Sequence, residues 1–490
     1  MDNSTQDLEL LIRSRVPLIV VETHDEPQVV ALFRRLTQHL NMPVMRWSVA
    51  AGLQRIDLDL QSQTPVKSPD QVLAQIKNTA TPGIYLLLDF HPYFEDSAVV
   101  RQIREIALGY GSAGHTLVFV SHTLHLPPEL HAVSARFDLE LPDSAKLEQI
   151  IREEARQWVQ DHPDAKIKTD DETLRQLVRR LAGLAEIDAR RLVRKAIYDD
   201  GAITRSDLTA VLKARYELAD QSGALSLELD TAGFADIGGL DHLKRWLIQR
   251  RTAFAGTDMA LDRPKGILLV GVQGSGKSLA AKAVAGVWGL PLLRLDFGAL
   301  YNKFFGETER NIRQALKTAE SMSPCVLWID EIEKAIAGGD YDSGTSKRVL
   351  GTLLTWLSER SSPVFLVATA NRIDQLPPEL IRKGRLDEIF FVDLPDATTR
   401  ARIFDIHLRK RNLESAEFDL KRLAEGSQGF SGAEIEQAVV AALYLAREQN
   451  RPLDTGHLIS ELSQTRPLSR VMTEQVQALR AWARDRTVAA

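Results

Sequence analysis

A glycine-rich loop, GVQGSGKS at residues 271–278, stands between an apolar run at 266–270 and a helix-forming run at 279–287. This order predicts a strand, a loop and a helix. The backbone amides of such a loop converge on phosphate oxygens at the helix N-terminus, which favours anions. Lys277 would reach the outer phosphates and Ser278 would bind magnesium. We therefore predict an α/β domain that binds a nucleoside triphosphate and Mg²⁺.

Two carboxylates end the apolar run CVLWIDE at residues 325–331, which indicates a buried parallel strand. Active sites of open α/β sheets lie at the carboxyl edge of their strands. Asp330 is suited to hold magnesium beside Ser278, and Glu331 to orient or deprotonate an attacking water. An isolated Asp-Glu pair is more often a solvated turn, but a phosphate loop at this distance favours the catalytic interpretation.

A third apolar run, VFLVATANR at residues 364–372, ends in Asn371, whose amide can hydrogen-bond a γ-phosphate or the attacking water. Arg382 and Arg385 follow, on either side of Gly384. Arginines of this kind usually form surface ion pairs. An arginine presented to the nucleotide of an adjacent subunit instead supplies roughly 10³ to 10⁵ in rate. We expect Asn371, Arg382 and Arg385 to act with Glu331.

The two halves of the chain share an ordered series of motifs. LPPEL occurs at 126–130 and at 376–380, each time after an apolar run and before a DLELPD or FVDLPD segment. This order favours duplication over chance similarity. After the first apolar run of the N-terminal half, at 18–22, the chain reads THDEPQVV, without glycine or lysine, and its acidic residues would repel phosphate. We predict one nucleotide site, in the C-terminal half.

Composition restricts the remaining possibilities. The chain of 490 residues is 44% hydrophobic and 26% charged, as in soluble globular proteins, and no apolar run is long enough to span a bilayer. The single cysteine, Cys325, excludes an intramolecular disulfide and is expected in the core. The N-terminus does not resemble a signal peptide, which favours a cytoplasmic protein. The net charge of −5 gives no reason to expect nucleic acid.

The C-terminal half resembles the AAA subgroup of the AAA+ ATPases, from about Phe234 onward. GVQGSGKS and WIDE resemble Walker A and Walker B, ATANR the first sensor, and RKGR the paired arginine fingers. Gln273 departs from the family's usual proline. The resemblance implies an ATP-hydrolysing ring, a homohexamer, with nucleotide between subunits. The residues that it places around ATP are Asp236, Ile237, Gly238, Gly271, Gln273, Gly274, Ser275, Gly276, Lys277, Ser278, Leu279, His407, Gly432 and Ala433.

The same resemblance suggests what ATP is used for. YNKFFGETE at 301–309 is similar to the family's central-pore loop, in which Phe304, Phe305 and Gly306 would grip a polypeptide. A buried pair of phenylalanines is the alternative, and GGDYDSGTSKR at 338–348 lies where a second pore loop would be. We expect a motor that remodels or threads a protein client. A regulatory switch or assembly scaffold without threading is the alternative, and a nucleic-acid motor is weaker because basic residues do not cluster there.

The whole chain resembles the AAA reading-frame proteins of cyanobacteria and plastid genomes, which implies a cytoplasmic or plastid-stromal location. The expected fold is a P-loop NTPase (AAA+) parallel sheet with a C-terminal helical lid, preceded by a degenerate AAA-like α/β domain. The expected domains are a degenerate α/β domain at 1–145, its helical appendix at 146–220, an active α/β domain at 221–397 and a helical lid at 398–490. Residues 220–232 are interpreted as the linker. The aromatics of loop 89–97 would contact a partner or, more often, cap the domain's own core.

Overall fold

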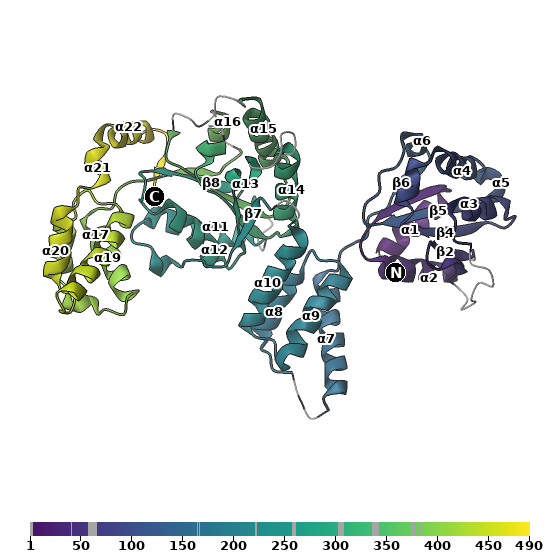
Figure 1. The fold of residues 1–490 in the computed structure, drawn as a ribbon, viewed down its shortest axis with the longest axis horizontal. Helices are drawn as coiled ribbons and strands as arrows, with labels where there is room; N and C mark the ends of the chain where they lie inside the picture. The colour runs from purple at the N-terminus through teal and green to yellow at the C-terminus, as the bar shows by residue number, and fades with distance from the viewer. Residues whose placement is uncertain are drawn as a thin grey trace. The chain divides into compact units, whose positions relative to one another are not determined.

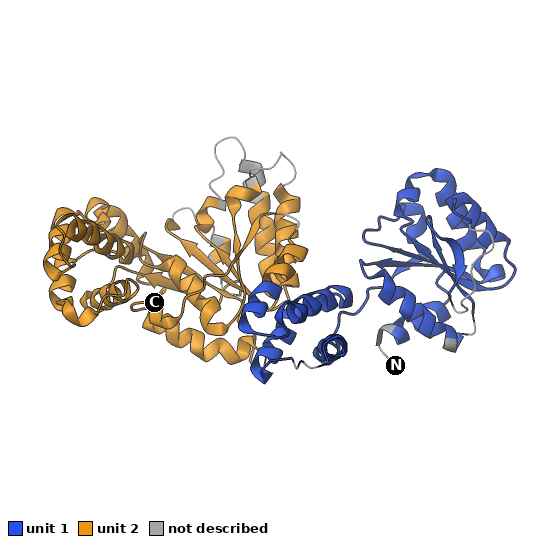
Figure 2. Cartoon of the chain, turned by 60° about the horizontal axis from the view of Figure 1, so that its bottom comes forward, with its two compact units in different colours: residues 1–211 blue, residues 212–490 orange. Residues whose placement is uncertain are grey.

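The computed structural model describes residues 3–40, 42–56, 66–163, 165, 167–220, 223–256, 261–301, 308–335, 343–373, 376, 378–382 and 384–490. The chain divides into two compact units, residues 1–211 and 212–490, which are coloured separately in Figure 2. Each unit contains its own α/β sheet (Figure 1). Among the helices described, none combines the length and the apolar character that a bilayer crossing requires.

The sheet of the first unit has six strands in the order β3-β2-β4-β5-β1-β6. All neighbours are parallel except β2 and β3, which form an antiparallel pair at one edge. The central strands are buried almost throughout and mostly apolar because helices cover both of their faces. The strands are β1 (Leu18–Glu22), β2 (Val44–Ser48), β3 (Gly52–Arg55), β4 (Gly83–Leu88), β5 (His115–Ser121) and β6 (Ser134–Arg136).

Helices flank this sheet and then form a separate helical appendix. The flanking helices are α1 (Asn3–Arg13), α2 (Glu26–Leu40), α3 (Pro69–Asn78), η1 (His91–Glu95), α4 (Ser97–Leu108), α5 (Tyr110–Ala113) and α6 (Pro128–His131). The appendix consists of α7 (Ser144–Asp161), α8 (Asp171–Leu181), α9 (Glu186–Asp200) and the first part of α10 (Arg205–Ala219). Phe90 and Phe94 of loop 89–97 pack with Trp47 and Phe119 in the core, so these aromatics cap their own domain.

The sheet of the second unit has seven strands in the order β13-β12-β8-β11-β10-β9-β7. Only the edge strand β7 is antiparallel to its neighbour. Alternate residues of the central strands enter the cores on opposite faces: Leu327 and Ile329 lie in one, Val326 and Trp328 in the other. The strands are β7 (Leu225–Glu228), β8 (Gly266–Gly271), β9 (Leu292–Leu295), β10 (Cys325–Ile329), β11 (Val364–Ala370), β12 (Glu388–Val392) and β13 (Val488–Ala489).

The helices of the second unit flank the sheet and build a lid with its own apolar core around Phe404, Ile435 and Leu458. Around the sheet are η2 (Phe234–Asp236), α11 (Asp241–Phe254), α12 (Lys277–Trp288), α13 (Phe297–Tyr301), α14 (Thr308–Ser321), η3 (Ile332–Ala335), α15 (Ser343–Glu359) and α16 (Pro378–Ile381). The lid contains α17 (Ala397–Arg409), η5 (Ser415–Glu417), α18 (Leu420–Gly426), α19 (Gly432–Glu448) and α20 (Thr455–Gln464), and α21 (Leu468–Val471) and α22 (Thr473–Ala483) follow.

The two sheets share one topology. The parallel strands run β2-β4-β5-β1-β6 in the first unit and β9-β10-β11-β8-β12 in the second, so strands of equal rank occupy equal places. The repeated LPPEL motif starts a short helix at its second proline in both units, α6 and α16. The α/β fold with a helical lid, preceded by a degenerate copy, is therefore the fold that the sequence predicted.

Two local predictions have different outcomes. Cys325 is fully buried at the start of β10 and its thiol donates to the Ala319 carbonyl at 3.3 Å, as expected of a core cysteine. Burial raises the pKa of this thiol to about 12. The interpretation of residues 220–232 as a linker is wrong in part, because residues 225–228 form β7. Leu225 and Leu227 alternate with polar residues, and this pattern suits an edge strand that pairs with β9.

Candidate functional site

The glycine-rich loop connects β8 to α12, and its glycines meet different structural needs. Gly271 ends β8 where a Cβ atom would lie 2.0 Å from the carbonyl oxygen of Val392 in β12, so the close approach of that strand requires glycine. Gly274 and Gly276 adopt left-handed φ values of 76° and 98°. Gly276 caps α12, whose first backbone amides face the loop.

Lys277 folds back onto its own loop. Its ammonium group donates to the carbonyl oxygens of Gly271 at 2.9 Å and Val272 at 2.7 Å, and the residue is 6% exposed. Burial lowers the pKa of Lys277 to about 8, and the charges of Glu333, Asp330 and Glu331 oppose this shift. The lysine is therefore held inside the loop by bonds that an anionic ligand can replace.

Asp330 follows β10 and joins the loop to the neighbouring strand β11. Its Oδ1 accepts hydrogen bonds from Ser278 Oγ at 3.2 Å and Thr369 Oγ1 at 2.6 Å. Thr369 Oγ1 also accepts the backbone N–H of Glu331 at 2.9 Å. Sequence reasoning did not identify Thr369. The only local signal for it is a hydroxyl inside the apolar run of β11.

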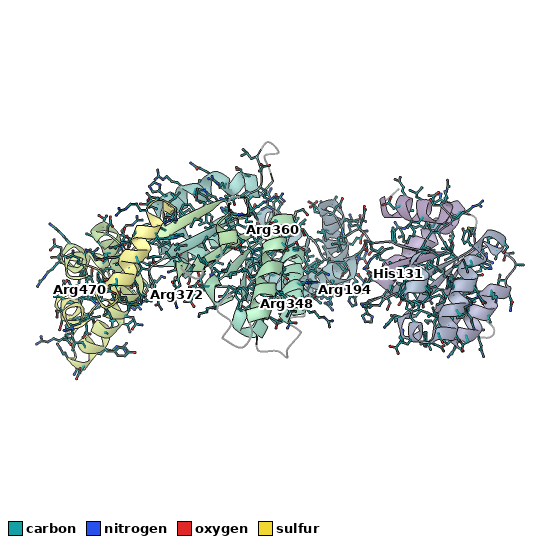
Figure 3. The ribbon with its side chains drawn as sticks, turned by 90° about the horizontal axis from the view of Figure 1, so that it is seen from above. His131, Arg194, Arg348, Arg360, Arg372 and Arg470 are labelled. Carbon is teal, nitrogen blue, oxygen red and sulfur yellow. The ribbon has the colours of Figure 1, made fainter. Side chains whose placement is uncertain are left out.

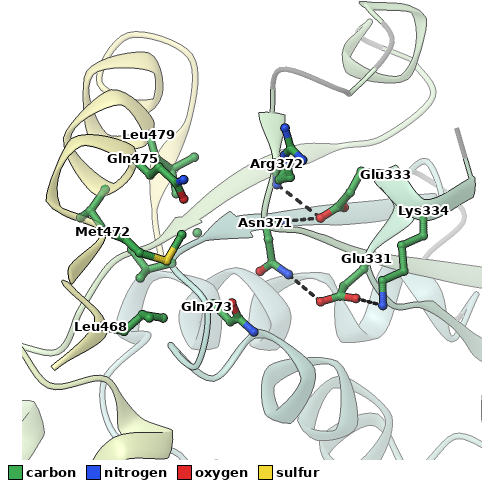
Figure 4. Close-up of a pocket in the computed structure, with 13 residues that line it drawn as sticks. Gln273, Glu331, Glu333, Lys334, Asn371, Arg372, Leu468, Met472, Gln475 and Leu479 are labelled. Atoms are coloured by element: carbon green, nitrogen blue, oxygen red, sulfur yellow. Dashed lines mark hydrogen bonds and ion pairs between the residues drawn. The ribbon is translucent and has the colours of Figure 1, made fainter. Parts of the chain in front are cut away.

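Glu331 has a left-handed backbone, with φ 50°, and both of its carboxylate oxygens have partners. Asn371 Nδ2 donates to Oε1 at 2.8 Å, and the Lys334 ammonium pairs with Oε2 (Figure 4). Behind this pair lies Glu333, 5% exposed, whose Oε1 accepts the backbone N–H groups of Asn371 at 2.8 Å and Arg372 at 3.3 Å. Glu333 thus holds Asn371 in place, a role that the sequence did not reveal.

The loop, the carboxylates and the lid enclose a cavity of about 370 Å³. Ser275 Oγ is buried and has no hydrogen-bond partner among the described atoms, so it is ready for a ligand, while His407 Nδ1 is buried with only the Glu436 carboxylate near it, at 3.5 Å. The cavity brings together these residues that the sequence assigned to the site: Asp236, Ile237, Gly238, Gln273, Gly274, Ser275, Gly276, Lys277, Ser278, Leu279, Asp330, Glu331, Asn371, His407, Gly432 and Ala433. Its lining also includes Leu240 and Ile406, together with Thr369, Ile403, Lys410 and Glu436, which the sequence did not identify.

The lid is attached to the loop by a backbone hydrogen bond. The N–H of Ala433, the second residue of α19, donates to the Gly274 carbonyl at 3.2 Å. A Cβ atom at Gly274 would lie 2.8 Å from Ser431 Oγ, so this glycine also permits the close approach of the lid. On the lid side, burial lowers the pKa of His407, and the nearby carboxylate of Glu436 opposes this shift.

A second cavity, of about 390 Å³, lies beside the first and is drawn in Figure 4. Gly271, Glu331 and Asn371 line it on one side, and Leu468 and Met472 on the other. Arg372, labelled in Figure 3, also belongs to its lining. Glu331 and Asn371 line both cavities and are therefore accessible from two directions.

The two candidate arginine fingers lie elsewhere. Arg382 and Arg385 follow α16, and neither lines the cavity of its own chain. Arg382 is exposed, while Arg385 is half-buried and donates to the Glu379 carbonyl at 2.6 Å. The candidate pore residues Phe304, Phe305 and Gly306 lie outside the described residues, as do positions 338–342 of the second candidate loop. Helix α15 begins at Ser343.

The first unit has a carboxylate where the second has its glycine loop. Asp25 follows β1, is 3% exposed and caps α2, because its Oδ1 accepts the N–H of Gln28 at 3.1 Å. Its Oδ2 accepts the N–H of Ile187 at 3.1 Å. Ile187 is the second residue of α9, as Ala433 is of α19. An internal anion therefore occupies helix N-termini in this unit.

These features define an AAA ATPase. A model of the AAA family, the ATPase family associated with various cellular activities, matches residues 267–394. The N-terminal domain and the second domain of SpoVK-like AAA ATPases match residues 4–139 and 145–222. The AAA domain implies ATP binding and ATPase activity.

The chain belongs to the family of the AAA domain-containing protein ycf46. It is 37% identical to ycf46 of Guillardia theta over 486 residues, which cover 98% of this chain and 94% of the relative. Identity to ycf46 of Trieres chinensis is 36% over 485 residues, covering 97% of this chain and 96% of the relative. A proteasome-activating nucleotidase of Aeropyrum pernix is 34% identical over 297 residues, covering 58% of this chain and 71% of the relative.

Proposed function

We propose that this chain hydrolyses ATP at one site per subunit, in a ring in which each nucleotide lies between neighbours. The observation that carries the proposal is the convergence of the phosphate loop, Asp330, Glu331, Asn371 and the lid helix α19 on one cavity. Ser275 Oγ supplies a buried polar atom without a hydrogen-bond partner, as expected of a site built for a polar ligand.

The residues divide the work as follows. Lys277 exchanges its two loop carbonyls for phosphate oxygens, which also return its ammonium group to a favourable environment. Glu331 accepts a proton from, or orients, the attacking water, and Asn371 fixes the direction of that carboxylate. Asn371 and Lys334 each hold one oxygen of Glu331, and the remaining lone pair on each oxygen is left to accept the attacking water.

The oxygen ligands near the phosphate loop fit Mg²⁺. Ser278 Oγ and the Asp330 carboxylate are hard ligands 3.2 Å apart, the pair that this cation needs beside nucleotide phosphates. These two residues would hold the ion, which neutralises charge on the phosphates when bound. Thr369 keeps Asp330 in position through its hydroxyl.

Arg382 and Arg385 support the ring, because they follow the catalytic strand β11 but do not line their own cavity. An arginine that acts on the neighbour's nucleotide implies a head-to-tail interface that closes by rotation. Mixing two inactive variants tests this arrangement. Arg385→Ala retains Glu331, and Glu331→Gln retains Arg385, so about a quarter of the interfaces in a random mixed ring contain both intact residues.

We expect each variant alone to bind ATP but to turn over slowly, and the mixture to regain activity. If the mixture stays as inactive as its parts, Arg385 does not act in trans. The mass of Glu331→Gln in solution provides the companion measurement. With ATP it should approach six times 54.7 kDa by light scattering, whereas a monomer or dimer under all conditions contradicts a ring.

For the use of the hydrolysis energy, we propose remodelling or threading of a protein client. Support comes from the likeness of residues 301–309 to a pore loop. Phe304→Ala tests this directly. A motor keeps its ATPase activity and loses client processing, whereas a regulatory switch or scaffold keeps both.

A further inference from the structure

Three side chains gather at the carboxyl edge of the first sheet, where the degenerate unit has no phosphate loop. Asp89 follows β4, His91 opens η1, and His122 follows β5. One ligand atom from each of the three lies within 4.8 Å of the others. We propose that Asp89, His91 and His122 bind a divalent transition-metal ion of the zinc class, a site separate from the magnesium ligands of the second unit.

The chemistry of the three groups suits such an ion. Two imidazoles and a carboxylate are ligands that zinc and its neighbours prefer, whereas Mg²⁺ and Ca²⁺ prefer oxygen alone. Ligands around tetrahedral zinc lie about 3.4 Å apart. The side chains therefore need only small rotations to close on the ion, and Asp89 and His122 are exposed enough to make them.

Ser121 forms hydrogen bonds with two of the proposed ligands, Asp89 and His91. Its hydroxyl donates to Asp89 Oδ1 at 3.1 Å and lies 2.7 Å from His91 Nδ1. A hydroxyl has one proton, so when that proton goes to Asp89 the oxygen accepts from His91 Nδ1–H. This tautomer leaves the lone pair of His91 Nε2 for a metal, which is how buried hydrogen bonds commonly set metal-binding histidines.

The backbone and the neighbouring rings support the arrangement. Asp89 has a left-handed φ of 49°, which turns the chain sharply at the end of β4. The ring of His122 meets His91 edge-on, with centroids 5.0 Å apart, and stacks on His24 at 5.7 Å. In the described part of the chain, no lysine or arginine forms an ion pair with Asp89, so its charge is available to a cation.

Titration of the full-length, chelator-treated protein with Zn²⁺ in the absence of nucleotide tests the proposal. We expect one equivalent to bind in competition with a chromogenic indicator, and Asp89→Asn, His91→Ala and His122→Ala each to weaken binding by about tenfold or more. The matched control is His125→Ala, which removes an exposed histidine outside the cluster. It should bind zinc as the unaltered chain does.

A second measurement separates loss of the site from loss of the fold. Without metal, the three variants and the parent should unfold at the same temperature, while zinc should raise that temperature only in the parent and in His125→Ala. Two results would overturn the proposal. One is the absence of stoichiometric binding. The other is zinc binding that persists in all three variants, which would place the ion elsewhere, for example at Ser278 and Asp330.

Discussion

The two units have the same order of parallel strands, but the helices that follow their first parallel strands, α2 and α12, have different groups at their N-termini. In the second unit Gly276, which has no side chain, caps α12, so the first amides of this helix are available to a ligand. Lys277 donates to two carbonyl oxygens of the loop. In the first unit the carboxylate of Asp25 accepts from both Gln28 and Ile187. The difference teaches that a helix N-terminus favours an anion, and that a protein can supply one itself or leave the position to a ligand.

Substitution of an acidic residue at the end of a strand in each unit, Glu331 in the second and Glu22 in the first, should give the largest contrast. Glu331→Gln should lower ATP turnover by about 10² to 10⁴, because it removes the proposed base while retaining the shape of the side chain. Glu22→Gln, at the carboxyl end of β1 in the first unit, should leave turnover unchanged. Steady-state ATPase assays on both variants make the measurement. Equal losses would mean that the first unit also takes part in hydrolysis.

Removal of one cation from the nucleotide cavity of the second unit, compared with one from a cavity of the first unit, should give the next largest effect. Lys277→Ala should weaken ATP binding about 10- to 100-fold, since a charge-assisted hydrogen bond contributes roughly 1.5–3 kcal/mol. The first unit has a cavity of its own, lined by Arg35 together with Asp25 and Arg190, and Arg35→Ala should leave ATP affinity unchanged. Binding of a fluorescent ATP analogue reports both. An affinity loss in Arg35→Ala would contradict a single nucleotide site.

The internal anion can be tested through stability. Asp25→Ala removes a helix cap and also the bond to Ile187, while Asp143→Ala removes only the cap of α7. Loss of a cap costs about 1 kcal/mol, and loss of the hydrogen bond to the Ile187 N–H should add about 0.5–1.5 kcal/mol. Urea unfolding of the first unit measures the difference. Equal losses for the two variants would show that the contact with α9 contributes little.

The smallest expected effect concerns pH. It compares His407 in the nucleotide cavity of the second unit with Arg190 in the cavity of the first unit. Burial lowers the pKa of His407 in the second unit. The unfolded chain therefore takes up this proton first as the pH falls below about 6.5, and stability declines from there through the folded pKa. Arg190, which lines a cavity in the first unit, is different: burial alone would lower its pKa, but hydrogen bonds and ion pairs with Glu153 and Glu186 raise it. It stays charged throughout.

We therefore expect His407→Gln to flatten the decline in the free energy of unfolding between pH 7 and pH 5. His131→Gln changes an exposed histidine and serves as the control. Denaturant titrations at several pH values supply the slopes. If the slope of His407→Gln equals that of the parent chain, burial of this imidazole does not govern the acid sensitivity of the lid.

Sequence patterns predicted the fold and gathered most of the candidate site, because their information is local. The loop at 271–278 and the acidic residues after 329 can each be recognised from a stretch of a few residues. Thr369 and Glu333 were missed because their roles depend on pairing between β10 and β11, where Ile329 lies opposite Ala368. Two segments far apart in the sequence, the loop after β4 with Asp89 and His91 and the end of β5 with His122, supply the cluster at one edge of the sheet. Only the strand order brings them together.

The full burial of the Cys325 thiol has a practical consequence for experiments that attach probes to cysteine residues. Since thiolates are the species that react with common probes, a thiol with a pKa raised to about 12 and no exposed surface stays silent. The chain contains no other cysteine. A cysteine introduced on α17 or α19 would then be the sole site of attachment, so dyes or spin labels could report lid opening without any background to remove.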